Sequence, residues 1–238
     1  MIHEFSRTEL LIGPEKFRRI KKASVMVFGV GGVGSHCIEA LARTGVGKLI
    51  LVDNDKVSVT NINRQSIAFH STVGEYKTQV MKRKILDICP DTEVETHEVF
   101  VLPDNVDSIL DCRPDYIVDA IDTVTAKLAL AKKAMEYNIS IISSMGTGNK
   151  LHGEMFEIED ISRTSVCPLC KVMRRELKKQ GITHLKVLYS KEKPVKTDPD
   201  KMEEDPGTRR SLPGSISFVP PIAGLLIAGE VIRDIAGL

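Results

Sequence analysis

Residues 25–34 read Val-Met-Val-Phe-Gly-Val-Gly-Gly-Val-Gly, an apolar run that passes directly into glycines. This order predicts a strand, a tight turn and a helix, and such a turn brings backbone N–H groups and a helix N-terminus close to a phosphate. Asp53 closes the next apolar run, residues 48–52, where a carboxylate accepts hydrogen bonds from ribose hydroxyls. Residues 1–55 therefore predict a site for an adenine nucleotide. Its expected phosphate-binding glycines are Gly29, Gly31, Gly32 and Gly34.

Length and composition favour one α/β domain over residues 1–238. A hydrophobic content of 42% is enough for one sizeable core. The formal net charge of +1 excludes a chain that binds nucleic acid through its overall charge, so any such surface must be local. The five cysteines are odd in number, which favours reduced thiols in the cytoplasm over a disulfide framework.

No segment predicts export or a membrane span. Residues 1–7 lack an apolar signal core. The most apolar run, 220–228, is shorter than the roughly 20 residues that cross a bilayer, and charged residues follow it. This run predicts a buried helix, and no membrane partner is expected.

Strand and helix patterns alternate as far as Ser144. Such alternation predicts a Rossmann-like, doubly wound, mostly parallel sheet with helices on both faces. Ligands of these sheets lie at the carboxyl ends of the strands, where Gly29, Asp53 and Asp122 all fall. The expected strands are 24–28, 49–52, 93–97, 116–118 and 140–142, and the expected helices are 34–43, 78–88, 103–110 and 125–137.

The pattern changes after Ser144. Residues 167–180 predict a basic helix, and residues 186–189 predict a strand. Residues 190–210 are rich in Pro, Lys, Asp and Glu without apolar periodicity, so they predict a mobile surface loop. An apolar helix over residues 218–235 is expected to close the domain.

Four polar motifs follow the glycines, each at or just past the end of an expected strand and outside the core. They are Asp53-Asn54-Asp55, Asn61-Ile62-Asn63-Arg64-Gln65, Gly74-Glu75-Tyr76-Lys77 and Asp119-Ala120-Ile121-Asp122-Thr123. In this order and spacing, the set resembles the E1-like (ThiF-type) adenylating superfamily, which includes ubiquitin-activating enzymes and bacterial sulfur-carrier activators. The resemblance covers residues 5–160 and the last helix. It implies an enzyme that activates a carboxylate with ATP and releases pyrophosphate.

The chemistry of such a reaction explains the cations of the motifs. Carboxylate attack on an α-phosphate brings anions together, so catalysis needs positive charge and a metal ion around the triphosphate. By the resemblance, Arg64 and Lys77 contact phosphates and Asn61 helps to position them. Taken alone, Arg64 and Lys77 have a second interpretation as solvated surface charges.

The acidic residues and the N-terminal arginine receive roles from the same resemblance. Asp53 binds the ribose, and Asp122 holds Mg²⁺ directly or through water. Asp55 is expected near the metal or the phosphates. Arg7, in Phe5-Ser6-Arg7, resembles an arginine that reaches into the partner subunit's ATP site, which implies a homodimer. Asp122 has an alternative role as a cap of the helix that starts near Thr125.

The cysteines do not form the zinc site common in sulfur-carrier activators. Structural zinc takes four ligands, and the chain has a single CxxC motif, Cys167-Pro168-Leu169-Cys170. We therefore expect no zinc, and a packed pair or an occasional disulfide instead. Cys167 begins a basic helix, which makes it a candidate nucleophile. Cys37, His36 and His70 are expected to be structural.

Two later stretches indicate one branch of the family. Residues 164–177 and 212–220 resemble the tRNA threonylcarbamoyladenosine dehydratases, which adenylate a carboxylate on a tRNA adenosine and then close a ring with loss of AMP. A basic strip beside an ATP crevice would steer a phosphate backbone. It comprises Lys171, Arg174, Arg175, Lys178 and Lys179, followed by Lys186, Lys191, Lys193 and Lys196.

Other functions remain open at this stage. The first is an activator of the C-terminal carboxylate of a ubiquitin-like sulfur carrier. The second is a nucleotide-binding module without adenylation, such as an NAD-binding protein, although hydride transfer needs none of Arg64, Lys77 and Asp122. A sulfur-relay protein also remains open as a partner. A solvated helix face is the simpler interpretation of the basic strip.

Overall fold

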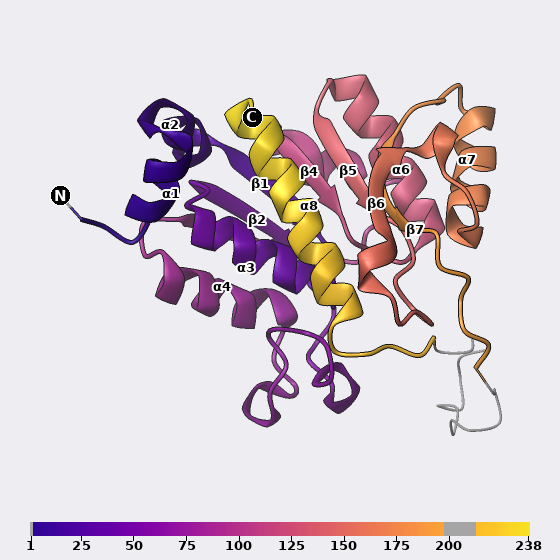
Figure 1. The fold of residues 1–238 in the computed structure, drawn as a ribbon, viewed down its shortest axis with the longest axis horizontal. Helices are drawn as coiled ribbons and strands as arrows, with labels where there is room; N and C mark the ends of the chain where they lie inside the picture. The colour runs from indigo at the N-terminus through magenta and orange to yellow at the C-terminus, as the bar shows by residue number, and fades with distance from the viewer. Residues whose placement is uncertain (1, 198–212) are drawn as a thin grey trace.

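The structure is a computed structural model that describes residues 2–197 and 213–238. A seven-stranded sheet forms its centre, in the order β3-β2-β1-β4-β5-β7-β6, and every pairing is parallel except that of β6 with β7 (Figure 1). The predicted doubly wound, mostly parallel sheet is confirmed. The strands are β1 (Ser24–Phe28), β2 (Lys48–Val52), β3 (Glu93–His97), β4 (Tyr116–Asp119), β5 (Ser140–Ser144), β6 (Phe156–Asp160) and β7 (Lys186–Ser190).

Helices cover both faces of the sheet because successive strand residues point to opposite sides. Val25 and Val27 of β1 pack in one core cluster with residues of α3, α4 and α8, whereas Met26 and Phe28 pack in another with residues of α5 and α6. The α-helices are α1 (Ser6–Ile12), α2 (Pro14–Lys22), α3 (Gly34–Thr44), α4 (Lys77–Ile88), α5 (Val106–Ile109), α6 (Val124–Tyr137), α7 (Pro168–Lys179) and α8 (Val219–Ala236). Short 3-10 turns are η1 (Val59–Asn61), η2 (His70–Thr72), η3 (Leu110–Cys112), η4 (Gly153–Met155) and η5 (Ile161–Arg163).

The register of the strands sets the position of the site. Phe28 is level with Val52 on one side and with Asp119 on the other. Because these residues end their strands, the segments that follow β1, β2 and β4 leave the sheet side by side. The Gly29 N–H donates to Val52 O at 2.8 Å, and the Ala120 N–H donates to Phe28 O at 2.8 Å.

The structure departs from the sequence predictions in several elements. The helix expected at 103–110 is only the short α5, followed by η3, and neither α1, α2 nor β6 was predicted. β6 reads Phe-Glu-Ile-Glu-Asp at the sheet edge, so its pattern is polar. The helix expected to be buried, α8, is covered on one side only, because Leu225 is 54% exposed. Part of the predicted mobile loop, 198–210, lies outside the described residues.

None of the helices in residues 2–197 and 213–238 has the length and apolar character needed to cross a membrane.

Candidate active site

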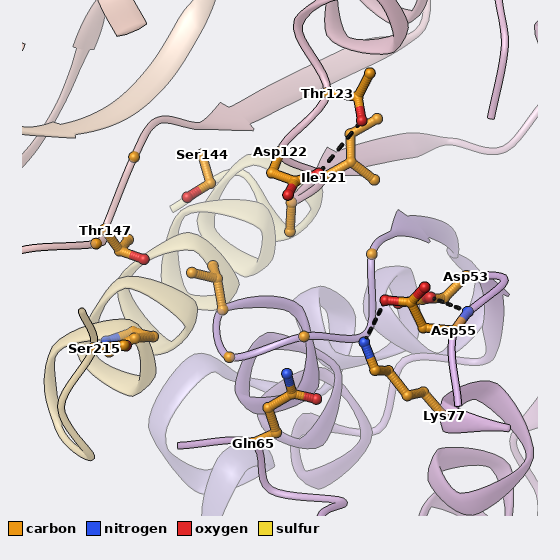
Figure 2. Close-up of a pocket in the computed structure, with 18 of the residues that line it drawn as sticks. Asp53, Asp55, Gln65, Lys77, Ile121, Asp122, Thr123, Ser144, Thr147 and Ser215 are labelled. Carbon is orange, nitrogen blue, oxygen red and sulfur yellow. Dashed lines mark hydrogen bonds and ion pairs between the residues drawn. The ribbon is translucent and has the colours of Figure 1, made fainter. Parts of the chain in front are cut away.

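A cavity of about 710 Å³ opens at the carboxyl ends of β1, β2, β4 and β5. Its walls include residues from every polar motif in the sequence and the glycine turn (Figure 2). A volume of this size is typical of small-molecule sites. Of the predicted residues, the cavity lining contains Gly29, Gly31, Gly32, Asp53, Asp55, Asn61, Arg64, Lys77 and Asp122.

The glycine turn needs its glycines for different reasons. Gly29 has φ +90°, and a Cβ there would lie 2.7 Å from Ala120 O. A Cβ on Gly34 would lie 1.8 Å from Gly29 O, so this glycine allows the helix to pack on the turn. Gly31 is the open position, since a Cβ would meet only Gln65 Nε2, at 3.9 Å. The free space at Gly31 suits a phosphate that approaches the backbone.

Asp53 fixes the glycine turn to the end of β2. Its Oδ2 accepts from the Val30 N–H at 2.7 Å, and its Oδ1 accepts from the Asp55 N–H at 2.8 Å. The carboxyl is buried, and this burial, opposed by nearby Lys77, raises the pKa of Asp53 above its usual value. Each oxygen keeps lone-pair capacity for a further donor, so the side chain remains a suitable acceptor for a ribose hydroxyl.

Lys77 places an ammonium group in the cavity from the first residue of α4. Its Nζ donates to Asp55 Oδ2 at 2.7 Å (Figure 2). The Lys77 side chain is 7% exposed, whereas that of Asp55 is 59% exposed. The Lys77 ammonium group sits on a buried side chain, and its partner Asp55 stays in contact with water. Lys77 can therefore bind a second anion, such as a phosphate.

Asn61 is the last residue of η1, and Arg64 lies in the segment that follows it. Asn61 is buried, and its Oδ1 accepts from the Ser58 N–H at 3.1 Å. Arg64 donates from Nη1 to Thr60 O and to Asn63 Oδ1, at 3.0 and 2.9 Å. Partial burial lowers the pKa of Arg64 slightly from an ordinary value so high that the guanidinium stays charged. Both side chains therefore reach the cavity from a locally braced segment.

Asp122 faces the cavity and is not a helix cap. α6 begins at Val124 with Thr123 as its N-cap, and no side chain caps it. The Thr123 hydroxyl lies 3.4 Å from an Asp122 oxygen (Figure 2). An exposed carboxylate across the cavity from Lys77 offers the hard oxygen ligand that Mg²⁺ takes together with substrate phosphates. The residues present thus fit a magnesium ion.

Asp119 corrects the prediction that each polar motif lies outside the core. It is 1% exposed, and it pairs with Lys127, also 1% exposed, at 3.0 Å. Lys127 Nζ also donates to Ser144 O at 2.7 Å, and the Ser143 hydroxyl donates to Asp119 at 2.5 Å. A charge can stay this deep only when paired and hydrogen-bonded. The group lies directly beneath the loop that carries Asp122.

Sequence reasoning gave no role to several cavity residues. Gln65 is 7% exposed, and its Oε1 has no partner among the described residues (Figure 2). Gln65 lines the cavity, and its amide Nε2 lies nearest the open position at Gly31, so this side chain is a further candidate contact for a ligand. Gln65 belongs to the 61–65 motif, and this membership is the sequence signal that could have identified it as a site residue. Further parts of the wall, residues 99–101, 145–148 and 213–215, come from loops without a motif pattern.

Two other predicted features lie away from the cavity. Arg7 is exposed on α1 and is not part of the described lining. The basic helix predicted at residues 167–180 is partly neutralised in the structure. Arg174 turns inward to Ile161 O and Thr164 O, and both Arg175 and Lys179 pair with Glu176. Lys186 and Lys191 likewise bind acids, while Lys171, Lys178, Lys193 and Lys196 are exposed.

The fold and the cavity are those of a doubly wound α/β protein whose glycine turn, Lys77 and Asp122 line one cavity at the carboxyl ends of the strands. The model of the ThiF family matches residues 5–238, and the chain belongs to this family. A tRNA threonylcarbamoyladenosine dehydratase of Bacillus subtilis (strain 168) is 42% identical over 99% of this chain and 95% of its own.

Solved structures give the same result. The crystal structure of E. coli tRNA N6-threonylcarbamoyladenosine dehydratase, TcdA, in complex with AMP matches with a TM-score of 0.89 and 30% identity. The match covers 98% of this chain and 94% of that one. The structure of the same protein with ATP matches with a TM-score of 0.88, 30% identity and the same coverage.

Proposed function

We propose that this chain is an ATP-dependent tRNA threonylcarbamoyladenosine dehydratase that works as one adenylating domain. The observation that carries the proposal is the single cavity in which the open glycine turn, the Lys77–Asp55 pair and Asp122 meet. Relatives of almost equal length bear this activity in their names. The modified nucleoside supplies the carboxylate that such a cavity would activate.

The reaction takes place in two steps. A carboxylate oxygen of the threonylcarbamoyl group attacks the α-phosphorus of ATP, and pyrophosphate leaves, which gives a mixed acyl–phosphate anhydride. A nucleophile of the same modified nucleoside then attacks the activated carbonyl and expels AMP. The nucleoside loses the elements of one water, and the oxygen lost from the carboxylate leaves on AMP.

The cationic residues hold the charge that develops on the phosphates. Lys77 and Arg64 contact the triphosphate, Asn61 helps to orient it, and the backbone N–H groups around Gly31 donate to its oxygens. Asp53 binds the ribose. Lys77 keeps one hydrogen bond to Asp55, so its orientation is set before the nucleotide binds.

Asp122 would hold Mg²⁺, directly or through water, with Asp55 as a nearby acid. A bound magnesium ion would supply neutralising charge to the phosphates and the departing pyrophosphate. Asp122 itself is held in place from below, because the 119–122 segment starts at the buried Asp119–Lys127 pair.

The enzyme is a homodimer in this proposal, and Arg7 acts in the partner's cavity. Two observations support it: Arg7 lies outside its own cavity, and Leu10 and Leu11 beside it are 87% and 85% exposed on α1. Subunits with Lys77→Ala mixed with subunits with Arg7→Ala should regain activity, since a mixed dimer contains one intact site. Activity that never rises on mixing would contradict the arrangement.

The phosphate backbone of the tRNA is expected to contact the exposed lysines near the cavity. Lys171 and Lys178 are exposed on α7, and Leu169 of the same helix lines the cavity. The contact should weaken as salt rises because phosphate binding releases counterions. This activity belongs in the cytoplasm, where tRNA and ATP are available.

The test is mass spectrometry of nucleosides from tRNA that carries threonylcarbamoyladenosine, incubated with protein, Mg²⁺ and ATP. The parent protein and a control, Lys133→Ala, should yield a nucleoside lighter by one water. Lys77→Ala should not, although it folds. An unchanged nucleoside from parent protein that binds ATP would overturn the proposal and favour a sulfur-carrier substrate.

A further inference from the structure

The CxxC motif forms a compact pair of thiols at the start of α7. Cys167 is the N-cap of this helix, and Cys170 lies in its first turn. Both are buried, at 4% and 0% exposed, in the core cluster that also contains Met173 and Tyr189. Residues three apart in a helical turn share one face. The two cysteines consequently lie close together at the start of the helix.

The two thiols differ in acidity. The neighbouring Cys170 thiol and the N–H groups of Cys170 and Leu169 favour the Cys167 thiolate, which lowers the pKa of Cys167 below its usual value. The same contact and burial raise the pKa of Cys170 well above its usual range. This is the asymmetry of thiol–disulfide exchange sites, in which one thiolate attacks and the second thiol resolves.

The backbone in front of the pair is strained. Val166 has φ +60°, a left-handed conformation that a β-branched residue rarely adopts. The Cys167 N–H closes the turn onto Ser165 O at 2.5 Å. Val166 itself is 49% exposed, so the residue next to Cys167 in the chain lies at the surface. Strain of this kind concentrates where the chain has a chemical role.

The pair also touches the wall of the nucleotide cavity. Leu169, which stands between the two cysteines in the sequence, lines the cavity, and so does Met145 of the same core cluster. α7 packs against α6, the helix that follows Asp122 (Figure 1). Formation of a disulfide between Cys167 and Cys170 would therefore act on the cavity wall through Leu169.

We propose that Cys167 and Cys170 are a reversible dithiol–disulfide site whose oxidation alters ATP binding through Leu169. The Cys167 thiolate attacks one sulfur of a small-molecule disulfide, and the other half leaves as a thiolate. Cys170 then loses its proton to solvent and attacks the Cys167 sulfur, which expels the second half. Two protein thiols are oxidised to one disulfide, and one disulfide oxidant is reduced to two thiols. The effect on ATP rests on the proposed function, whereas the disulfide itself does not.

The first experiment uses oxidised glutathione as the probe and Cys112→Ser as the background, because Cys112 is exposed. Intact mass should fall by two hydrogens, and a peptide map should join Cys167 to Cys170. Cys170→Ser should instead retain one glutathione on Cys167, a trapped intermediate that a purely structural cysteine would not give. Cys37 is the control: it is buried with a raised pKa and should stay unmodified.

Two further readouts sharpen the result. The alkylation rate of Cys167 should rise at a lower pH in the background protein than in Cys170→Ser, because Cys170 favours the Cys167 thiolate. Oxidation should change the ATP dissociation constant at least threefold, but not in Cys170→Ser treated in the same way. No disulfide and no glutathione adduct, or a zinc ion retained by both thiols, would overturn the site. A disulfide without a change in ATP affinity would overturn only the coupling to the cavity.

Discussion

Two lysine–aspartate pairs stand on either side of the glycine turn and differ in one respect. Each joins an aspartate at the carboxyl end of a strand to a lysine in the first turn of the next α-helix. Lys127 and Asp119 are both 1% exposed, and Lys127 Nζ contacts Asp119, Ser143 and Ser144. Lys77 is 7% exposed, but its partner Asp55 is 59% exposed and faces the cavity.

The difference in exposure separates a pair that stabilises the fold, Lys127–Asp119, from a pair that can bind a ligand, Lys77–Asp55. The buried lysine has all its protons used, and its removal would leave an unpaired carboxylate in the core. Lys77 at the cavity pairs with Asp55, which water can solvate. A phosphate can therefore join or replace Asp55 as the partner of Lys77 at low cost in free energy. The same two residue types therefore stabilise the fold in one place and serve chemistry in the other.

The largest effect is expected from Lys127→Met. The change leaves Asp119 buried without its cation, which should lower the free energy of unfolding by about 3–5 kcal/mol. Equilibrium unfolding in urea measures it. Adding Asp119→Asn should recover part of the loss, because the buried charge is then gone. If the free energy of unfolding of Lys127→Met lay within about 1 kcal/mol of the parent value, the two pairs would not differ in the way described.

Lys77→Ala should affect activity and leave the fold intact. Removal of one preorganised cation from the phosphates should slow ATP–pyrophosphate exchange by about 10²–10³-fold. The unfolding midpoint should stay near that of the parent, since Asp55 remains in water. The comparison would fail if unfolding, and not exchange, proved to be the main loss.

A smaller effect is expected from Asp53→Asn. Loss of the charged acceptor should weaken ATP binding by about tenfold, as measured by calorimetry. The parent should also lose affinity as the pH falls, because protonation removes the acceptor. Burial raises the pKa of Asp53, so this loss should begin at a higher pH than for an ordinary carboxyl. The variant should show no such pH-dependent segment, and an identical profile would assign the titration elsewhere.

The smallest effect is expected from a third pair, Lys133–Asp107, on the surface. The Lys133→Ala change should leave both the melting temperature and pyrophosphate exchange unchanged, because exposed ion pairs contribute little. It is the matched control for the other two lysines. A clear loss of activity would mean that lysine substitution as such disturbs the enzyme.

The strand ends that carry the site could be predicted from the sequence, whereas the buried pair beneath them could not. Apolar runs that end in glycine or aspartate define the parallel strands, so Gly29, Asp53 and Asp122 were placed at one edge correctly. Asp119 was not recognised as buried, because its partner Lys127 looks like an ordinary surface residue of an amphipathic helix. Only the three-dimensional pairing shows that it is enclosed.

Loops and edges were less accessible to sequence reasoning. Residues 213–215 reach the cavity from the segment before α8, and no local pattern announces a contact over such a distance. The strand β6 carries acids at the sheet edge, where one face is solvated, so it lacks the hydrophobic signal used for β1. The basic strip is weaker in the fold than in the sequence, since Arg175 and Lys179 are paired with Glu176 there.

The central claim is that the carboxylate of the modified nucleoside becomes an acyl adenylate in this cavity. It is tested most directly with threonylcarbamoyladenosine in tRNA whose carboxylate carries oxygen-18 at both positions. Attack on the α-phosphorus leaves one labelled oxygen in AMP, so mass spectrometry should find AMP with one oxygen-18 for each ring closed. Unlabelled AMP, or ADP with labelled phosphate, would contradict the account.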